Sequence, residues 1–307
     1  MIGVIILNYN TWRETEICVE TIKKYTTIPY KIYIVDNCSK DESPTKLNAL
    51  YRGVSDIEVI LNNKNTGYSA GNNVGIKQAE KEGCEYVFIV NSDVELLNDA
   101  FAIMLKTLKQ DSSYMMIGPS VVDNNNKETQ YPRSILTPKV FFYGRHPFCM
   151  ISYFAKRADR IIKSEKRPMV FEGSVSGCCF GIKTSDFRDA QYFDENVFLY
   201  YEEDILAYKM KKNGKKAVFD SDARVWHKAN VSTSKEGNAF VQYHRWTSVL
   251  YMLKTYAGIS KIQQILIALW NVLTWDILSI RSKKHREMRA DFSRKNWEIV
   301  HDVGECE

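Results

Sequence analysis

The sequence predicts an α/β fold built on a doubly wound, mostly parallel sheet, followed by a helical extension at the C-terminal end. Over the first 120 residues, short apolar runs alternate with helix-like segments, an order typical of a parallel sheet with helices on both faces. The runs are rich in Ile and Val, as strands covered on both faces should be. From about residue 239 onward the pattern is helical.

The alternating pattern predicts the elements of this sheet in order. The expected strands are Ile2–Leu7, Lys31–Val35, Ile57–Leu61, Tyr86–Val90 and Met115–Ile117. The expected helices between them are Thr11–Tyr25, Asp41–Tyr51, Ser69–Glu82 and Asn98–Gln110. Asn98 and Asp99 are residue types that begin helices, and Gly83 is one that ends them.

The alternation ends at the turn signal of residues 123–126. Strand-like, Gly-punctuated sequence returns at Val170–Lys183, and a helical pattern covers Ala239–Arg294. We interpret the later strands as additions to the same sheet. The expected organisation is one domain over residues 1–238, with a helical extension over residues 239–307 packed on it.

Composition limits the class of protein. A chain of 307 residues can bury a sizeable core, and its net charge of +5 is too small to indicate a nucleic-acid partner. Its seven cysteines have no C-x-x-C spacing, so reduced thiols in a reducing compartment are expected. The N-terminus enters the first strand without the basic region of a signal peptide. We therefore expect a cytoplasmic location.

Polar residues follow four consecutive strands of the predicted sheet. These segments are Asn8–Asn10, Asp36–Ser39, Asn65–Asn73 and Asn91–Asp93. One such segment alone would more often be turn chemistry. Because ligands bind beyond the carboxyl ends of the strands in an open α/β sheet, the four together predict a site for a polar ligand.

The residue types at these strand ends suit a nucleotide. Asp36 can accept a hydrogen bond from a base N–H, and Asn side chains both donate and accept. Gly67 and Gly71 allow backbone N–H groups close to a phosphate or sugar at a helix start. Asp93 can coordinate a hard divalent cation that bridges a diphosphate. The spacing of the glycines differs from G-x-G-x-x-G, and no P-loop motif occurs.

A second candidate cluster lies at Phe198–Asp204, where three acids follow an aromatic run. Acids are common at helix starts because the helix dipole favours them. An aromatic wall can also hold a sugar ring and desolvate a carboxylate, which then serves as general base toward a hydroxyl. His227 ends a later strand-like run and is either structural or a second metal or phosphate contact.

These segments, in this order over roughly Met1 to His227, resemble the family 2 glycosyltransferases, which are inverting enzymes with the GT-A fold. Ile5–Asn10 looks like the opening strand and loop of that family, and Ile34–Asn37 with Ser39 is similar to its base-binding segment. Asn65–Gly75 resembles the N-x-G-[FY]-x-x-x-N-N-x-G stretch of its rhamnosyltransferase-like branch.

Three further positions match the family's metal and catalytic motifs. Asn91-Ser92-Asp93 stands where the family has its D-x-D metal motif, with Asn91 replacing the first Asp. Glu203-Asp204 falls where the catalytic E-D pair is expected, although the run of three acids leaves its register ambiguous. His227 falls where a late metal-site His often lies.

The resemblance implies a role for each of these residues. Asp93 and His227 would hold Mg²⁺ or Mn²⁺, and Asp204 would be the catalytic base, with Glu203 as the alternative. The implied donor-binding residues are Asn8, Tyr9, Asn10, Asp36, Asn37, Ser39, Asn65, Gly67, Tyr68, Asn72, Asn73, Asn91 and Ser92. The implied acceptor-side residues are Glu172, Gly173, Ser174, Gly177, Tyr200, Tyr201 and Glu202.

The implied reaction is inverting transfer of a sugar from dTDP-rhamnose or a UDP-hexose to a saccharide or lipid-linked saccharide, in the synthesis of a bacterial surface polysaccharide. Two other classes stay open. A sugar nucleotidyltransferase uses a related sheet, but its Gly-rich basic loop is missing after the first strand. A non-catalytic nucleotide-sugar-binding or membrane-binding protein would not need the acid at position 204.

The C-terminal extension has an apolar helical face. Ile262, Ile265, Leu266, Leu269 and Leu273 share it, and the basic residues Arg281, Lys283, Lys284 and Arg286 follow. The apolar stretch Ile262–Trp275 is shorter than the roughly 20 residues of a membrane span. The face is a core contact, a homodimer contact, or a peripheral contact with an anionic membrane. The basic, aromatic segment Lys139–Arg167 favours the membrane contact, at the inner face of the plasma membrane.

Overall fold

The computed structural model describes residues 1–123, 125–130, 132–144, 168–228 and 237–301. Most of the basic, aromatic segment Lys139–Arg167 therefore lies outside the described residues. The chain forms two compact units. The sheet unit contains the described residues up to 135 together with 168–196 and 202–228, and the helical unit contains 136–144, 197–201 and 237–301.

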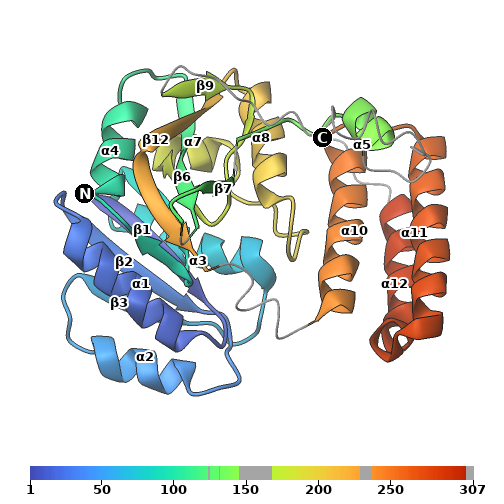
Figure 1. Ribbon diagram of the computed structural model, residues 1–307, viewed down its shortest axis with the longest axis horizontal. Helices are drawn as coiled ribbons and strands as arrows, with labels where there is room; N and C mark the ends of the chain where they lie inside the picture. The colour runs from blue at the N-terminus through green and yellow to red at the C-terminus, as the bar shows by residue number, and fades with distance from the viewer. Residues whose placement is uncertain (124, 131, 145–167, 229–236, 302–307) are drawn as a thin grey trace. The chain divides into compact units, whose positions relative to one another are not determined.

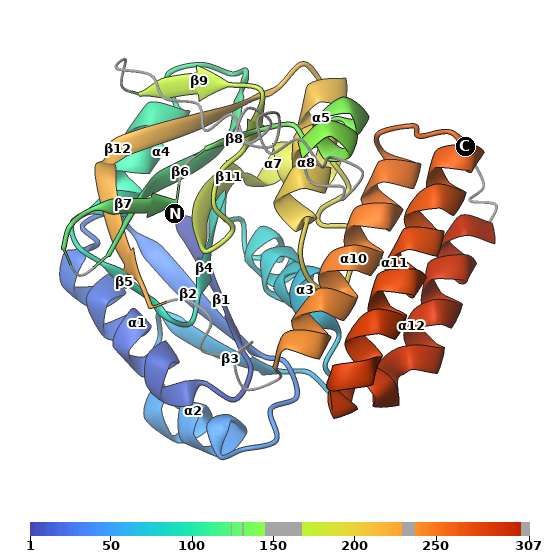
Figure 2. The same ribbon diagram turned by 45° about the vertical axis from the view of Figure 1, so that its right-hand side comes forward.

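The sheet unit is built around a mixed sheet with the strand order β3-β2-β1-β4-β11-β6-β12-β5 (Figures 1 and 2). Strands β3, β2, β1 and β4 are parallel, as are β6 and β12. Strand β11 lies antiparallel between β4 and β6, and β5 is antiparallel to β12. Strands β7 and β9 pair at the side with β6 and β12, and β8 and β10 form a separate two-stranded pair.

All five strands and four helices expected in the first part of the chain are confirmed, with small shifts at their ends. The strands are β1 (Ile2–Asn8), β2 (Tyr30–Asp36), β3 (Ile57–Leu61), β4 (Tyr86–Asn91) and β6 (Tyr114–Val122). The helices are α1 (Trp12–Tyr25), α2 (Ser43–Tyr51), α3 (Gly67–Lys81) and α4 (Ala100–Leu108).

The later part of the sheet unit adds short elements and one long strand. They are β5 (Val94–Leu96), β7 (Glu128–Gln130), β8 (Arg133–Ser134), β9 (Met169–Phe171), β10 (Gly173–Ser174), β11 (Cys179–Lys183), α7 (Thr184–Asp189), α8 (Glu202–Lys212) and β12 (Lys216–His227). The strand-like sequence at 170–183 is thus three strands separated by turns. The expectation that these elements extend the same sheet is confirmed for β9, β11 and β12.

Alternate side chains of the strands enter two cores, one on each face of the sheet. On β1, Val4 and Ile6 belong to the core under α1, α2 and α4. Ile5, between them, belongs to the core under α3, α7 and α8. This two-sided burial explains the nearly continuous apolar runs of the parallel strands.

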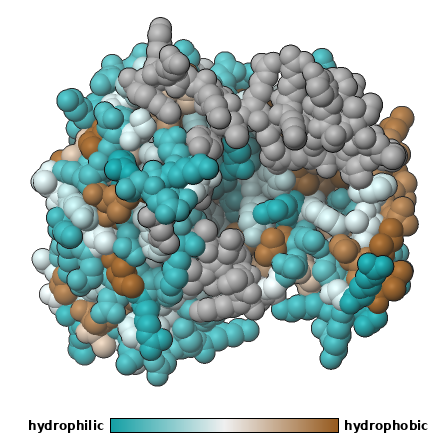
Figure 3. All heavy atoms as spheres, in the orientation of Figure 1, coloured by the Kyte–Doolittle hydropathy of each residue, from teal (hydrophilic) through white to brown (hydrophobic). Residues whose placement is uncertain are grey.

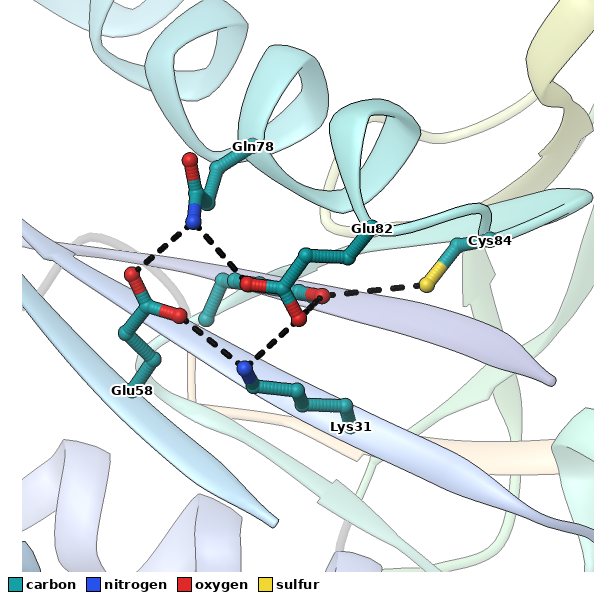
Figure 4. Close-up of polar contacts among 6 residues, drawn as sticks. Lys31, Glu58, Gln78, Glu82 and Cys84 are labelled. Carbon is teal, nitrogen blue, oxygen red and sulfur yellow. Dashed lines mark hydrogen bonds and ion pairs between the residues drawn. The ribbon is translucent and has the colours of Figure 1, made fainter. Parts of the chain in front are cut away.

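A polar network fixes the C-terminal end of α3 to the sheet (Figure 4). The ammonium of Lys31 on β2 lies 3.0 Å from Glu58 on β3 and 2.6 Å from Glu82 at the end of α3. Gln78 donates to both carboxylates, and the Tyr33 hydroxyl donates to Glu82. The contact with Lys31 lowers the pKa of Glu82 to about 2. The helix is therefore tied across two strands at the end opposite its Gly67 N-terminus.

The helical unit contains α5 (Pro138–Gly144), α10 (Asn238–Thr255), α11 (Lys261–Arg281) and α12 (Lys283–His301). Helices α10, α11 and α12 pack side by side, as the two ribbon views agree (Figures 1 and 2). Trp275 of α11 stacks on Phe292 of α12 with ring centroids 4.0 Å apart, and Ala239 of α10 joins this core.

Helix α11 is longer than the apolar stretch that the sequence delimits. Asp276 does not end it, because its carboxylate forms a two-point ion pair with Arg289 of α12 at 2.6 and 3.0 Å. The helix starts with Ser260 and Gln263 in a reciprocal capping box and continues to Arg281. By length and composition alone, it is the one helix among the described residues that could cross a membrane.

Candidate active site

The ends of β1, β2 and β4 lie side by side because their strands are in register. Asn8 is paired with Asp36, and Leu7 with Asn91. The polar segments that follow these three strands are thereby brought to one edge of the sheet, as expected for parallel strands.

Asn8 and Asp36 are joined directly at this edge. The Asn8 amide donates to Asp36 Oδ2 at 2.7 Å, and the Ser39 hydroxyl donates to the same oxygen at 2.6 Å. Asn8 Oδ1 in turn accepts from the hydroxyls of Thr11 and Thr15 at 3.2 and 2.8 Å. Asp36 and Asn8 are almost fully buried. These two side chains therefore brace the strand ends, whatever they contribute to a ligand.

Asn37 connects the end of β2 to the start of α3. Its amide nitrogen donates to Asn65 Oδ1 at 2.9 Å and to the Gly67 carbonyl at 3.0 Å. Its Oδ1 accepts from the side chain of Asn62 and from Thr66. Asn65 Oδ1 also accepts from the Gly67 N–H, where φ is +83°. Asn37 thus fixes the loop that begins α3.

Some residues of α3 pack on the sheet, and others form hydrogen bonds with neighbouring loops. Gly71 lies inside the helix, where an added Cβ would come within 2.7 Å of Leu7, so its missing side chain permits close packing on the sheet. The Asn73 amide holds the backbone of Phe193 and the carboxylate of Glu195. Asn72 is buried and donates to the Tyr68 carbonyl. The Tyr68 hydroxyl donates to the carbonyl of Gly177 at 2.7 Å.

The segment after β4 carries the Asp93–His227 pair. Strand β5 pairs with the end of β12, which places Val94 opposite His227. Asp93 Oδ1 lies 3.1 Å from His227 Nε2, and both side chains are about nine-tenths buried. Burial alone would lower the pKa of His227, but hydrogen bonds with Asp93 and Cys178 raise it to about 10. Asp93 and His227 are 134 positions apart in the sequence, and the pairing of β5 with β12 brings them together.

The donor set of this pair fits a divalent cation that a substrate helps to hold. The described residues contain no group of three or more His, Cys, Asp or Glu side chains that could hold a metal alone. Mg²⁺ commonly takes one or two protein ligands and fills its remaining positions with substrate phosphates and water. The Asp93 carboxylate satisfies that pattern, and the imidazole would add a second ligand when His227 releases its proton on binding.

The acid cluster begins α8, and its middle member packs on a glycine. Gly177 precedes β11, and a Cβ built on it would lie 1.4 Å from Glu203 Oε1. Burial raises the pKa of Glu203, the charge of Arg133 lowers it, and the nearby Asp204 raises it further. Glu203 therefore holds its proton to a higher pH than an ordinary glutamate. A carboxylate with this property is suited to general-base chemistry.

Asp204 is in a different environment from Glu203. It is buried, and Ser174 Oγ on β10 lies 3.4 Å from its Oδ1. Glu202, the first acid, is also buried. Glu172 is exposed and pairs with Lys211 at 3.1 Å on α8. The predicted acceptor-side residues before β11 thus all lie on segments that contact α8 or its side chains. They are Glu172, Gly173, Ser174 and Gly177.

The site residues predicted from the sequence do not all lie in the same unit of the structure. Tyr200 and Tyr201 belong to the helical unit, although Glu202 directly after them belongs to the sheet unit. Both tyrosines have φ near +70°, which is uncommon for residues other than glycine. Within the helical unit the guanidinium of Arg245 lies over the Tyr200 ring, 5.0 Å from its centroid.

Several residues of the site were missed by sequence reasoning. Thr11, Thr15 and Cys178 form hydrogen bonds with candidate residues, and the charge of Arg133 lowers the pKa of Glu203. None of the four belongs to a motif. The start of β11 lies against the end of β4, with the Asn91 N–H donating to the Cys178 carbonyl at 2.8 Å. The two adjacent cysteines in the sequence do not predict that Cys178 lies beside the end of β4. Cys178 comes to lie there because β11 inserts antiparallel next to β4.

Gly177→Ala should separate activity from stability. The three heavy atoms nearest to the added methyl group all belong to the Glu203 side chain, so we expect the carboxylate to be displaced while the fold is kept. A displacement of about 1 Å at a reacting group costs on the order of 10²-fold in rate. We expect kcat to fall by about that factor, with the melting temperature and the donor KM nearly unchanged. A variant with normal kcat would show that the contact between Gly177 and Glu203 is irrelevant to turnover.

Comparisons with known proteins agree with this architecture. A family model described as "Glycosyl transferase family 2" matches residues 3–185. An N-acetylglucosaminyl-diphospho-decaprenol L-rhamnosyltransferase of Mycobacterium tuberculosis is 24% identical over 272 residues, covering 84% of this chain and 86% of the relative.

Among solved structures, GalNAc-T7 with UDP, GalNAc and Mn²⁺ is similar with a TM-score of 0.61 at 14% identity, over 83% of this chain and 47% of that protein. S. aureus TarS 1-349 in complex with UDP-GlcNAc has a TM-score of 0.56 at 15% identity, over 97% and 81%. These structural neighbours are GT-A glycosyltransferases, which confirms the GT-A fold with a C-terminal helical region.

Proposed function

Since the chain belongs to glycosyl transferase family 2, we propose that it transfers a sugar from a nucleoside diphosphate to a saccharide or lipid-linked saccharide, with inversion at the anomeric carbon. The observation that carries this proposal is the convergence of three features at one edge of the sheet. They are the polar ends of β1 and β2, the Asp93–His227 pair, and the Glu203 carboxylate over Gly177.

The donor would lie across the strand ends, with its diphosphate toward Asp93. In this proposal Asp93 and His227 hold Mg²⁺ or Mn²⁺, which would offset the charge developing on the leaving diphosphate. The buried bonds among Asn8, Asp36 and Ser39 keep the strand ends in one conformation, so little ordering is needed when the donor binds.

Of the two candidate bases, the structure favours Glu203 over Asp204, the residue that the sequence favoured. The pKa of Glu203 is raised, and its carboxylate packs on Gly177. Asp204 is buried and contacts Ser174. We therefore assign proton removal from the acceptor hydroxyl to Glu203. Asp204 is assigned a positioning role, in which it holds β10 to the start of α8.

The donor and acceptor are proposed by analogy with the relatives. The mycobacterial relative is named for transfer of L-rhamnose to N-acetylglucosaminyl-diphospho-decaprenol, so dTDP-rhamnose and a lipid-diphosphate-linked sugar are our first candidates. A UDP-hexose or UDP-N-acetylhexosamine is the second donor candidate. The proposed process is the synthesis of a bacterial surface polysaccharide. None of the five described cysteines forms a disulfide, which supports a reducing, cytoplasmic location.

A panel of nucleoside-diphosphate sugars tests the proposal. The protein is incubated with each donor and Mg²⁺ or Mn²⁺, and thermal stability and release of free nucleotide are measured. One donor should raise the melting temperature and be hydrolysed slowly without an acceptor. With an acceptor, nuclear magnetic resonance of the product should show the inverted anomeric configuration.

Two results would contradict the proposal. If a nucleoside triphosphate and a sugar phosphate released pyrophosphate, the chain would be a nucleotidyltransferase. If a donor bound but no acceptor or water ever released its nucleotide, the chain would be a non-catalytic binding protein.

A further inference from the structure

Helix α11 of the helical unit turns an apolar face to solvent. Six Ile and Leu side chains on it are between 45% and 75% exposed: Ile262, Leu266, Leu269, Leu273, Ile277 and Ile280. They recur every three or four residues, so they form one stripe along the helix, which we call the apolar stripe. At ~1.5 Å per residue it is roughly 27 Å long. Hydrophobic atoms gather along this edge of the helical unit, at the right of Figure 3.

The opposite, buried face of α11 mixes polar and apolar side chains. Gln264, Asn271 and Ser279 lie there with Ile267, Ala268 and Trp275. Asn271 donates to Asn296 of α12 at 2.9 Å, and the indole N–H of Trp275 donates to the His285 carbonyl at 2.9 Å. The helix therefore has a mixed buried face and an apolar exposed face, whereas an ordinary surface helix exposes its polar side. Because the six stripe residues are exposed, the stripe is not a core contact within the described residues.

Charged residues on and beside α11 argue against a helix that spans the bilayer. A spanning α11 would carry the two-point pair of Asp276 and Arg289 and its neighbour α12 into hydrocarbon. Helix α12 begins Lys283-Lys284-His285-Arg286, and charged side chains at the bilayer centre are costly. A helix that is apolar on one side only is suited to lie in the plane of the membrane interface.

The charges at the ends of the stripe favour lipid over a second copy of the chain. Lys261 begins α11, and the cationic cluster Arg281, Lys283, Lys284 and Arg286 follows its end. If two copies packed stripe to stripe, a parallel arrangement would place the cationic clusters together. An antiparallel arrangement would place each cluster near the partner's Lys261. Either arrangement opposes like charges, whereas an anionic surface neutralises both ends.

We propose that the apolar stripe docks on the surface of an anionic lipid bilayer, with its Ile and Leu side chains among the acyl chains and the cationic cluster at the lipid phosphates. The reaction proposed above does not require this contact, because donor and catalytic residues lie in the sheet unit. The contact would hold the protein at the surface where a lipid-linked acceptor resides.

Vesicle flotation of the full-length protein tests the docking. We expect the protein to float with vesicles of equal parts phosphatidylcholine and phosphatidylglycerol, and much less with phosphatidylcholine alone. Leu269→Gln with Leu273→Gln should weaken partitioning at least about tenfold, because two half-buried leucines are lost. Gln is nearly as good a helix former as Leu, so the fold should persist. The matched control replaces the exposed helical residues Ile17 and Leu50 by Gln and should float like the wild type.

Arg281→Gln with Arg286→Gln should weaken binding to the anionic vesicles by about 30-fold, since two cations are removed and each contributes about 1 kcal/mol near such a surface. Hydrolysis of a soluble donor should be unchanged in every variant, which separates this test from that of the reaction. If the wild type does not float at low salt, the proposal is wrong. It is also wrong if the leucine variant floats normally while sedimentation shows that it has turned a dimer into a monomer.

Discussion

Glu203→Gln should lower kcat by about 10²- to 10⁴-fold, the usual contribution of a general base. The substitution removes the proton acceptor but preserves the size of the side chain over Gly177. Donor KM should change little, since the strand-end residues around Asn8 and Asp36 are untouched. The measurement is steady-state kinetics with donor and acceptor varied separately.

Asp204→Asn tests whether Asp204 acts as the base or only positions the start of α8. The most informative measurement is the dependence of kcat on pH. The general base must be ionised, so the rate falls as the pH drops through the pKa of Glu203, which burial raises above its ordinary value of 4.5. The negative charge of Asp204 also raises this pKa. Removing that charge should therefore shift the acid limb of kcat to lower pH while much of the rate is retained.

Arg133→Gln supplies the opposite control for the same pH profile. The charge of Arg133 lowers the pKa of Glu203, so its removal should move the acid limb to higher pH.

One pair of results would contradict the assignment of Glu203 as the base. If Asp204→Asn abolishes turnover and Glu203→Gln retains most of it, Asp204 is the base, as the sequence alone favoured.

Asp93→Ala should remove metal-dependent turnover. The variant loses the one carboxylate of the proposed cation site, and a metal ion contributes several kcal/mol of transition-state stabilisation in such reactions. We expect kcat/KM to fall by about 10²- to 10³-fold, or ~3–4 kcal/mol. Activity should be titrated with Mn²⁺ and Mg²⁺, and binding of Mn²⁺ in the presence of nucleoside diphosphate measured by calorimetry.

Asp222→Asn is the matched control for this variant. Asp222 is exposed and lies on β12, the same strand as His227, but its side chain does not contact the site. It should keep full activity and metal response. Wild-type activity in the presence of a strong chelator, equal to that with metal, would overturn the metal assignment.

The first half of the sheet, which carries the proposed donor site, is predictable from sequence because the patterns that indicate it are local. Each strand from β1 to β4 is a short apolar run bounded by turn residues, and the parallel order follows from the alternation with helices. The strand-end residues Asn8, Asp36 and Asp93 are then brought together by the general rule for such sheets. The family resemblance rests on the same local segments.

The remaining half depends on pairings between distant residues. Nothing local shows that β11 runs antiparallel between β4 and β6, or that β5 pairs with β12 to bring His227 to Asp93. The choice between Glu203 and Asp204 also depends on which of them packs on Gly177. The continuation of α11 beyond Asp276 depends on Arg289, 13 residues later on another helix.

The reversed direction of β11 has a consequence for how the two substrates are recognised. The parallel strands deliver their residues to the site at their carboxyl ends, whereas β11 delivers Gly177 and Cys178 at its amino end. The two sets of loops therefore belong to separate stretches of the chain, and the strand ends proposed for donor binding all lie before residue 96. Under the proposed roles, changes in the length or composition of the chain between β6 and β11 would alter acceptor choice while the proposed donor-binding framework is kept.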